Sequence, residues 1–214
     1  MLVLVLDTAT PAVTAALVAV DRAGARLLSS RVTVDARAHA ELLTPHLLAC
    51  LAEVRATPAD LGAVVCGTGP GPYTGLRVGM VTAAALGDAL GVPVHGVCSL
   101  DGIGGAVPHA GELLVVTDAR RKEVYAARYT DRVRTGAPWV QRPAELDLTG
   151  VTAVAGARAL ATPLGLPVLG PERPDPVALV AAAALGAPPP PFTPLYLRRP
   201  DAVEPVRVPV AVPR

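Results

Sequence analysis

The sequence predicts a mixed α/β protein that consists of two related units. Short aliphatic runs bounded by glycine or proline are typical of buried strands, and longer stretches with helical spacing of apolar residues separate them. The order of strand, turn, strand and then strand, loop, helix occurs twice, and the second copy is shorter. The chain has 214 residues, of which 51% are hydrophobic and 3% aromatic, so we expect one or two domains with an aliphatic core.

Three strands and a helix open the first unit. The expected strands cover residues 2–6, 13–20 and 26–34 and form an antiparallel meander. A helix is expected over Ala38–Arg55, with an apolar stripe formed by Leu43, Leu47, Cys50, Leu51 and Val54. Pro45 cannot donate a helical hydrogen bond, so we expect a kink or a restart there with Thr44 as the cap.

A strand, a loop and a helix form the centre of the sequence, between residues 61 and 90. Ala63–Cys66 is short and apolar, as expected of an inner strand. The glycines and prolines of Gly67–Tyr73 predict a rigid loop, since glycine allows close approach and proline fixes φ. Thr74 is the expected cap of a helix that begins at Gly75.

Small residues recur at every fourth position along this helix. They are Gly75, Gly79, Ala83 and Gly87. At this spacing they share one helix face, and each glycine costs about 1 kcal/mol relative to alanine, so close packing must compensate. The face packs either on the protein's own sheet or on a helix of another protein, and the pattern alone leaves both interpretations open. The opposite stripe, expected to fill the core, contains Leu76, Met80 and Leu86, with Val78 and Val81 beside it.

The elements that follow are shorter. We expect strands at 92–97, 112–117, 123–129, 150–155 and 167–169, and an alanine-rich helix at 176–185. Ser99 is the expected cap of a short helix that ends near Gly102–Gly105. Pro188–Pro191 ends the second unit. Residues 192–214 are either a disordered tail or an extended segment that apolar side chains hold to the surface, namely Phe192, Leu195, Tyr196 and Leu197.

Composition and charge argue against several classes of protein. A net charge of +1, with no basic stripe interleaved with aromatic residues, argues against strong nucleic-acid binding. The three cysteines lie in apolar surroundings and are expected to be free thiols in the reducing cytoplasm. The first residues predict a strand rather than a signal peptide, and the alanine run at 177–185 is too short to cross a membrane.

Two motifs could contact a phosphate or a nucleotide. Asp7 and Thr8 end the first strand, where they could hold a magnesium-bound phosphate, although an Asx turn is the simpler interpretation. Gly69, Gly71 and Thr74 belong to the glycine–proline loop, whose amides and helix N-terminus could attract an anion. The loop matches neither the P-loop nor the dinucleotide fingerprint, and it lacks a lysine.

No complete catalytic or metal-binding set is apparent. His39 and His46 are seven residues apart, which on a helix is too far for one metal ion. The sequence has no GxSxG elbow. Asp118, Arg120 and Glu123 are expected in a charged hairpin turn, which is either simply solvated or contacts a partner or a phosphate. We therefore expect no metal, no cofactor and no catalytic residue in this chain.

Four segments together resemble the bacterial TsaB (YeaZ) family. They are DTATP at 7–11, GTGPGPYTGLRVG at 67–79, DARRKEVYAARY at 118–129 and PLYLRRPDAVEP at 194–205. The resemblance implies an α/β fold of the actin-like ATPase type (ASKHA, ribonuclease H-like), with two lobes of which the second is reduced. The implied divisions are a first lobe at 1–106, a reduced second lobe at 107–191 and a proline-rich C-terminal segment at 192–214.

The resemblance also implies a function without catalysis by this chain. TsaB proteins bind and activate TsaD, which transfers threonylcarbamoyl to adenosine 37 of tRNAs that read ANN codons, and TsaE is the third, ATP-hydrolysing member. They dock on TsaD through two first-lobe helices, and alone they form homodimers through the same surface. The implied docking residues here are Leu43, Leu47, Gly75, Arg77, Gly79, Met80 and Ala83. This favours a partner helix, rather than internal packing, for the small-residue stripe.

Two other functions stay open beside this one. An actin-like nucleotide-binding phosphotransferase or ATPase would use Asp7 and the glycine–proline loop. A glycoprotease-like peptidase acting on its partner would need a nucleophile and a base, which the sequence does not supply as a set.

Overall fold

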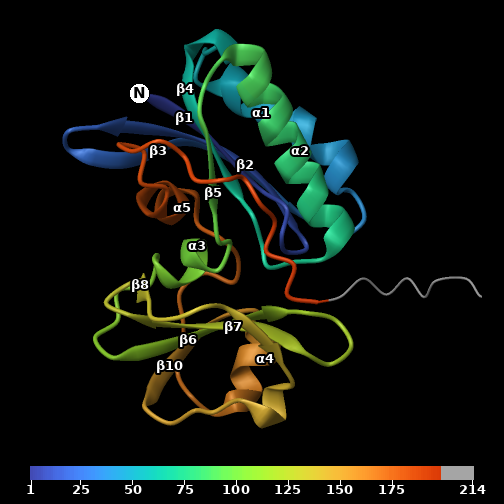
Figure 1. The fold of residues 1–214 in the computed structure, drawn as a ribbon, viewed down its shortest axis with the longest axis vertical. Helices are drawn as coiled ribbons and strands as arrows, with labels where there is room; N and C mark the ends of the chain where they lie inside the picture. Colours follow the sequence, from blue (N-terminus) through green and yellow to red (C-terminus); the bar gives the residue numbers. More distant parts are fainter. Residues whose placement is uncertain (199–214) are drawn as a thin grey trace, which may run out of the picture.

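The chain forms two stacked α/β units. A computed structural model describes residues 1–198. Figure 1 shows the first unit, in blue and green, above the second, in yellow and orange. Each unit is built on its own β-sheet, one of five strands and one of six among the described residues.

The first sheet has the strand order β3-β2-β1-β4-β5. Its strands are β1 (Leu2–Asp7), β2 (Ala12–Asp21), β3 (Gly24–Val34), β4 (Leu61–Gly67) and β5 (Val94–Val97). β1, β2 and β3 pair antiparallel, which confirms the meander, and β4 and β5 run parallel to β1. Side chains of β1 alternate between the two faces and are apolar on both, so each face needs a cover.

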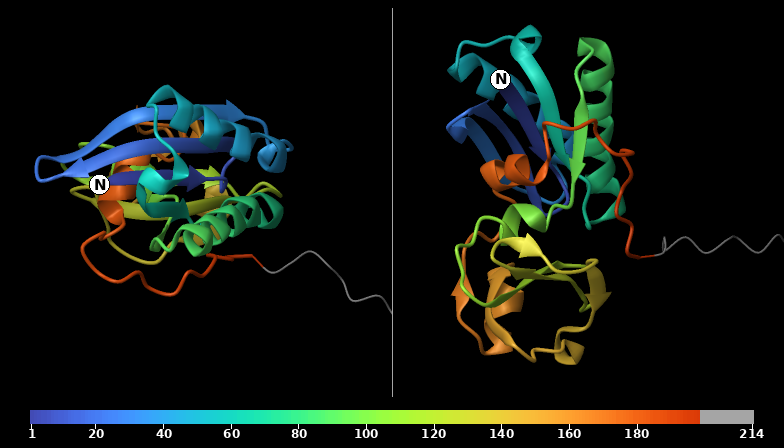
Figure 2. Two further views of the ribbon diagram at one scale, coloured as in Figure 1. Left: turned by 90° about the horizontal axis from the view of Figure 1, so that it is seen from above. Right: turned by 60° about the vertical axis from the view of Figure 1, so that its left-hand side comes forward.

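Helices α1 (His39–Glu53) and α2 (Tyr73–Leu90) cover one face of this sheet, and they lie side by side there (Figure 1 and Figure 2). Leu4 and Leu6 of β1 pack against them. α1 continues through Pro45 without the restart expected at Thr44. Pro45 is exposed, so water can satisfy the carbonyl oxygen that a proline leaves without a donor.

The opposite face is covered by α5 (Pro176–Ala182), which returns from the far end of the sequence. Leu179 of α5 packs in a core cluster with Val3 and Val5 of β1. The expected second lobe at 107–191 therefore contains a helix that packs on the first sheet, which corrects that division of the chain. The physical reason is the apolar second face of the first sheet, which would otherwise be exposed to water.

The second sheet has the order β11-β10-β6-β7-β8, and β9 also pairs with β7. Its strands are β6 (Glu112–Asp118), β7 (Val124–Thr130), β8 (Val133–Arg134), β9 (Trp139–Gln141), β10 (Val151–Gly156) and β11 (Val168–Leu169). β7, β6, β10 and β11 repeat the order and directions of β2, β1, β4 and β5. The predicted duplication is confirmed.

The remaining helices are short. They are α3 (Asp101–Gly104), α4 (Arg158–Ala161) and the 3-10 turns η1 (Pro58–Asp60), η2 (Pro143–Glu145) and η3 (Thr162–Leu164). The topology is the expected actin-like, ribonuclease H-like α/β fold with a reduced second unit. No helix within residues 1–198 combines the length and apolar character that a membrane span requires.

The described part of the C-terminal segment lies along the surface and connects the two units. Phe192 packs on the core of the first unit, and Leu195 and Leu197 pack on the core of the second. The N–H of Leu195 also donates to the carbonyl oxygen of Thr68, at 2.8 Å. Residues 199–214, which include part of the segment 194–205, lie outside the described residues.

Candidate functional site

Asp7 lies at the end of β1, fully buried between the loop that follows β4 and the one that follows β5. Its Oδ1 accepts a hydrogen bond from the N–H of Ala9, at 3.1 Å, and its Oδ2 accepts one from Ser99 Oγ, at 2.6 Å. Burial raises the pKa of Asp7 to about 6, and the hydrogen bonds from Ser99 and Ala9 and the charge of His39 oppose that rise. The simpler interpretation, an Asx turn, is confirmed.

Ser99 has a different role from the one predicted. It was expected to cap the short helix, but α3 begins after Leu100 and has no side-chain cap. Ser99 Oγ instead accepts from the N–H of Gly69, at 3.2 Å, while it donates to Asp7. It therefore ties the glycine–proline loop to the end of β1.

The other predicted phosphate-contacting residues are mostly occluded. Thr8 is buried, and its Oγ1 accepts from the N–H of Gly79, at 3.0 Å. Gly69 and Gly71 are buried, and a Cβ atom on Gly71 would collide with the backbone of Ala9. Thr74 is exposed, but it is not the helix cap, because α2 begins at Tyr73 with Pro72 as its N-cap residue. The glycines thus serve close packing of the loop.

A small cavity of about 90 Å³ lies between the two units beside these residues. Its lining includes Thr8, Thr10, His39 and Thr74 from the first unit and Asp118 and Arg120 from the second. Pockets that hold cofactors are typically about 300–1,000 Å³, so this space is too small for a nucleotide. The imidazole Nε2 of His39 is already paired with the carbonyl oxygen of Thr10, at 2.9 Å.

Within residues 1–198, no three histidine, cysteine, aspartate or glutamate side chains are grouped so that they could hold a metal ion. Cys50, Cys66 and Cys98 are buried free thiols, as expected. Burial raises the pKa of Cys66 well above its usual value and raises that of Cys98 to about 12. Such thiols are poor nucleophiles and poor metal ligands.

The small-residue stripe of α2 faces the protein's own sheet. A Cβ atom on Gly79 would lie 2.5 Å from Thr8 Oγ1, and one on Gly75 would lie 3.0 Å from the carbonyl oxygen of Thr8. A Cβ atom on Gly87 would collide with Val94 of β5. The interpretation that this stripe is open to a helix of another protein is therefore wrong, and internal packing is correct.

Most of the predicted docking residues are consequently in the core. The buried ones are Leu43, Leu47, Gly75, Gly79, Met80 and Ala83. Arg77 is exposed, and its guanidinium carbon lies 4.9 Å from the centre of the Tyr73 ring. Helical periodicity correctly identified a packed face of α2, but it could not show which element packs on that face.

The opposite, outward faces of α1 and α2 carry many apolar side chains. We call these the outer helix face, and they are Ala40, Pro45, Leu48, Ala49 and Ala52 of α1 with Val81, Ala84, Ala85 and Ala89 of α2. The exposed polar and charged residues among them include Glu41, Thr44, Arg77 and Asp88. Leu48 is 54% exposed and Val81 is 63% exposed. The expected core position of Val81 is therefore wrong, because this residue lies on the side of α2 that faces away from the sheet. The outward sides of a surface helix are normally charged, so an apolar outer helix face indicates a surface that contacts another molecule.

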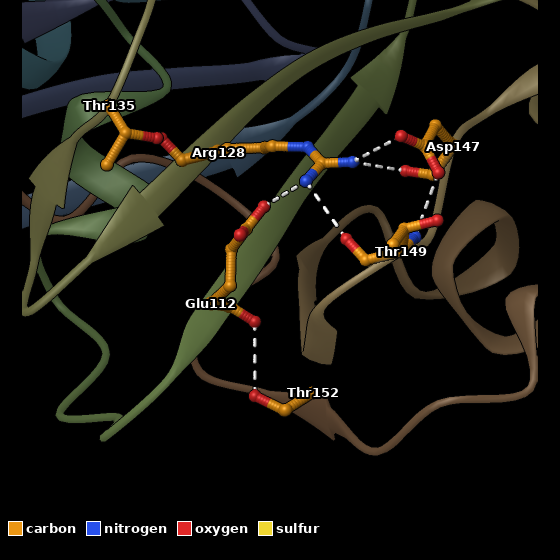
Figure 3. Close-up of polar contacts among 6 residues, drawn as sticks. All are labelled: Glu112, Arg128, Thr135, Asp147, Thr149 and Thr152. Atoms are coloured by element: carbon orange, nitrogen blue, oxygen red, sulfur yellow. Dashed lines mark hydrogen bonds and ion pairs between the residues drawn. The ribbon is translucent and has the colours of Figure 1, made fainter.

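The second unit has a polar network instead, which Figure 3 shows around Arg128 of β7. Its guanidinium pairs with the carboxylate of Glu112 on β6 and donates to the carbonyl oxygens of Asp147, at 2.6 Å, and Thr149, at 3.2 Å. These bonds fix the connection before β10 to the sheet. The Arg128 guanidinium finds these partners within the unit, which indicates a structural role.

Comparison with known proteins gives consistent results. The family model described as TsaD, tRNA N6-adenosine threonylcarbamoyltransferase, matches residues 27–149. The chain is 58% identical over 200 residues to an uncharacterized protein of Mycobacterium tuberculosis, covering 94% of this chain and 93% of the relative. It is 30% identical over 130 residues to the tRNA threonylcarbamoyladenosine biosynthesis protein TsaB of Bacillus subtilis, covering 60% of this chain and 55% of that protein.

Solved structures agree with these sequence matches. YeaZ from Pseudomonas aeruginosa superimposes with a TM-score of 0.75 at 25% identity, covering 92% of this chain and 99% of that one. A second structure from the same organism, described as similar to peptidase YEAZ, superimposes with a TM-score of 0.74 at the same identity and coverage.

Proposed function

Because the chain belongs to the TsaB (YeaZ) family, within the wider family of the threonylcarbamoyltransferase model, we propose that it is the accessory subunit that binds and activates a TsaD protein. The activated TsaD transfers threonylcarbamoyl to adenosine 37 of tRNAs that read ANN codons. TsaE is a further partner in this assembly, which works in the cytoplasm. When TsaD is absent, the chain forms homodimers.

The observation that carries this proposal is the outer helix face. Leu48 and Val81 are each more than half exposed, and alanines surround them on both helices. Small side chains allow the backbone of a partner helix to approach closely, and burial of the two aliphatic side chains would supply about 1.5–3 kcal/mol each. Docking on TsaD thus uses α1 and α2, the two helices that the sequence indicated. The contact is made by their outward sides and not by the small-residue stripe of α2.

The surroundings of Asp7 support an accessory rather than a catalytic role. Asp7 is buried and accepts a hydrogen bond from Ser99, and the neighbouring cavity of about 90 Å³ leaves no room for a nucleotide. The partners of Ser99 Oγ are a carboxylate and a backbone N–H, without an imidazole that could activate it as a nucleophile. Neither the ATPase nor the peptidase alternative gains support from these contacts.

Reconstitution of the reaction tests this proposal. Purified TsaD and TsaE of the same organism, an activated threonylcarbamoyl donor and an unmodified tRNA transcript are incubated with and without the chain, and modified adenosine is quantified. Formation of modified adenosine is expected to require the chain and to fall at least tenfold with Leu48→Glu. Val133→Glu, at an aliphatic position of the second unit that is 67% exposed against 54% for Leu48, should leave it unchanged. Full activity of TsaD without the chain, or modification by the chain alone, would overturn the proposal.

A further inference from the structure

The exposed aromatic residues of this protein gather at one place. The sequence holds six aromatic residues, and two of them, Tyr73 and Tyr196, are 50% and 42% exposed. Their ring centres are 5.1 Å apart although they are 123 positions apart in the chain. Exposed aromatic faces are costly in water, so a pair of them indicates a stacking surface.

Arg77 contacts this pair directly, since its Nη1 donates to the Tyr73 hydroxyl at 2.7 Å, and further basic side chains come from the β6–β7 turn and the C-terminal segment. Arg120 lines the same cavity as Pro72 and Thr74, the two neighbours of Tyr73, and Lys122 follows on the same β6–β7 turn. Arg198 lies two residues after Tyr196 and reaches the turn, since it donates to the carbonyl oxygen of Ala119 at 2.7 Å. We call Tyr73, Tyr196, Arg120, Lys122 and Arg198 the cleft rim.

The local charge is positive once the acidic neighbours are counted. Glu123 pairs with Arg198, at 2.8 Å, and Asp118 lies 3.8 Å from Arg120. Lys122 has no ion pair within the part of the chain that the structure describes. The backbone of this turn is also unusual, because Arg120 and Lys122 have φ values of 64° and 62°, a region that glycine or asparagine normally occupies.

We propose that the cleft rim contacts unpaired nucleotides of the RNA substrate, with bases against the two tyrosines and phosphates against Arg120 and Lys122. This inference rests on the proposed function, which brings a tRNA to the assembly. Unpaired RNA is bound by aromatic faces that stack on bases and by cations that contact phosphates, and the cleft rim supplies both. The contact adds to the RNA affinity of the assembly, since a few side chains give only weak binding by themselves.

Fluorescence anisotropy tests the cleft rim, with the full chain in complex with TsaD and a labelled oligouridylate or tRNA transcript at several salt concentrations. Arg120→Ala with Lys122→Ala is expected to lower affinity several-fold and to reduce the slope of log K against log salt by about 1.4, at about 0.7 per phosphate contact. Tyr196→Ala is expected to lower affinity about tenfold with the slope unchanged. The matched control is Arg22→Ala with Arg26→Ala, two exposed arginines near the turn of the β2–β3 hairpin, on the other side of the molecule from the β6–β7 turn (Figure 1).

Size-exclusion chromatography of each variant with TsaD separates the possible outcomes. Rim variants that still co-elute but bind RNA more weakly than the control support the inference. Wild-type RNA affinity in the rim variants, or an equal loss in the control, would overturn it. Loss of co-elution would show that the rim is a protein interface and would also overturn it.

If the wild-type chain fails to bind TsaD yet its own RNA binding depends on the rim residues, the proposed function fails and the RNA site stands.

Discussion

The two units share one sheet topology but differ in what their surfaces carry. In the first unit, helices of 15 and 18 residues cover the sheet and present an apolar outer face. In the second, α4 has four residues, and arginine contacts such as those of Arg128 hold the connections to the sheet. The sheet topology is therefore common to both units, while long helices occur only in the first unit within the described residues, so only that unit offers the surface proposed to bind TsaD.

The largest effect is expected from Gly79→Leu in the first unit. A Cβ atom there would lie 2.5 Å from Thr8 Oγ1, whose hydrogen bond to the Gly79 N–H would also be lost, so we expect more than about 3 kcal/mol of destabilisation. Urea denaturation followed by circular dichroism measures it. Ala84→Leu, at an exposed position of the same helix, is the control and should change stability by less than about 0.5 kcal/mol. A fully stable Gly79→Leu protein that cannot bind TsaD would restore the small-residue stripe as the docking face.

The next effect concerns Asp7, at the junction of the units. Burial raises its folded-state pKa from 3.8 to about 6, so the folded protein holds this proton more tightly than the unfolded chain. The contribution of Asp7 to the free energy of unfolding is therefore fully present below pH 3.8. It falls by about 3 kcal/mol as the pH rises from 3.8 to about 6.

Asp7→Asn removes this titration while keeping the shape of the side chain. We expect the free energy of unfolding of the variant, measured by urea denaturation between pH 4 and 8, to change less with pH than that of the wild type. Glu41→Gln, an exposed carboxylate of α1, is the control and should leave the wild-type profile intact. An unchanged profile in Asp7→Asn would show that Asp7 is not the group responsible.

A smaller effect is expected in the second unit. Arg128→Ala removes the ion pair with Glu112 and the bonds to the Asp147 and Thr149 carbonyl oxygens, at a site where the arginine side chain is 24% exposed. We expect about 2 kcal/mol of destabilisation. Hydrogen exchange should locate faster exchange in β6, β7 and β10 and leave β1 protected.

The matched control for this site is Arg142→Ala. Its side chain is 69% exposed and lies 3.9 Å from Glu145, so its loss should cost less than about 0.5 kcal/mol. Equal effects of the two substitutions, or exchange that rises equally in both units, would mean that the Arg128 contacts do not hold the second unit specifically.

Much of the fold followed from local pattern. Aliphatic runs located β1, β4, β6 and β10, and helical periodicity located α1 and α2. β8, β9 and α4 were missed because two to four residues give too little periodicity to detect.

The site was harder to predict because its parts meet only in the folded chain. Ser99 is 92 positions from the Asp7 carboxylate that it contacts, and the cleft rim joins residues near 73, 121 and 197. The sequence offered no contiguous basic and aromatic stripe, which is why it argued against nucleic-acid binding. A periodic stripe shows that a face is packed, but its neighbour is set by the tertiary fold, as the burial of Gly79 against Thr8 demonstrates.

We propose that the outer helix face of the first unit binds TsaD. Isothermal titration of TsaD with the wild type, Val81→Glu and Val133→Glu tests it most directly, because both valines are exposed, at 63% and 67%, one in each unit. We predict at least a hundredfold loss of affinity for Val81→Glu, since a carboxylate would be buried without a partner, and no change for Val133→Glu. Wild-type affinity in Val81→Glu, or an equal loss in Val133→Glu, would contradict this account.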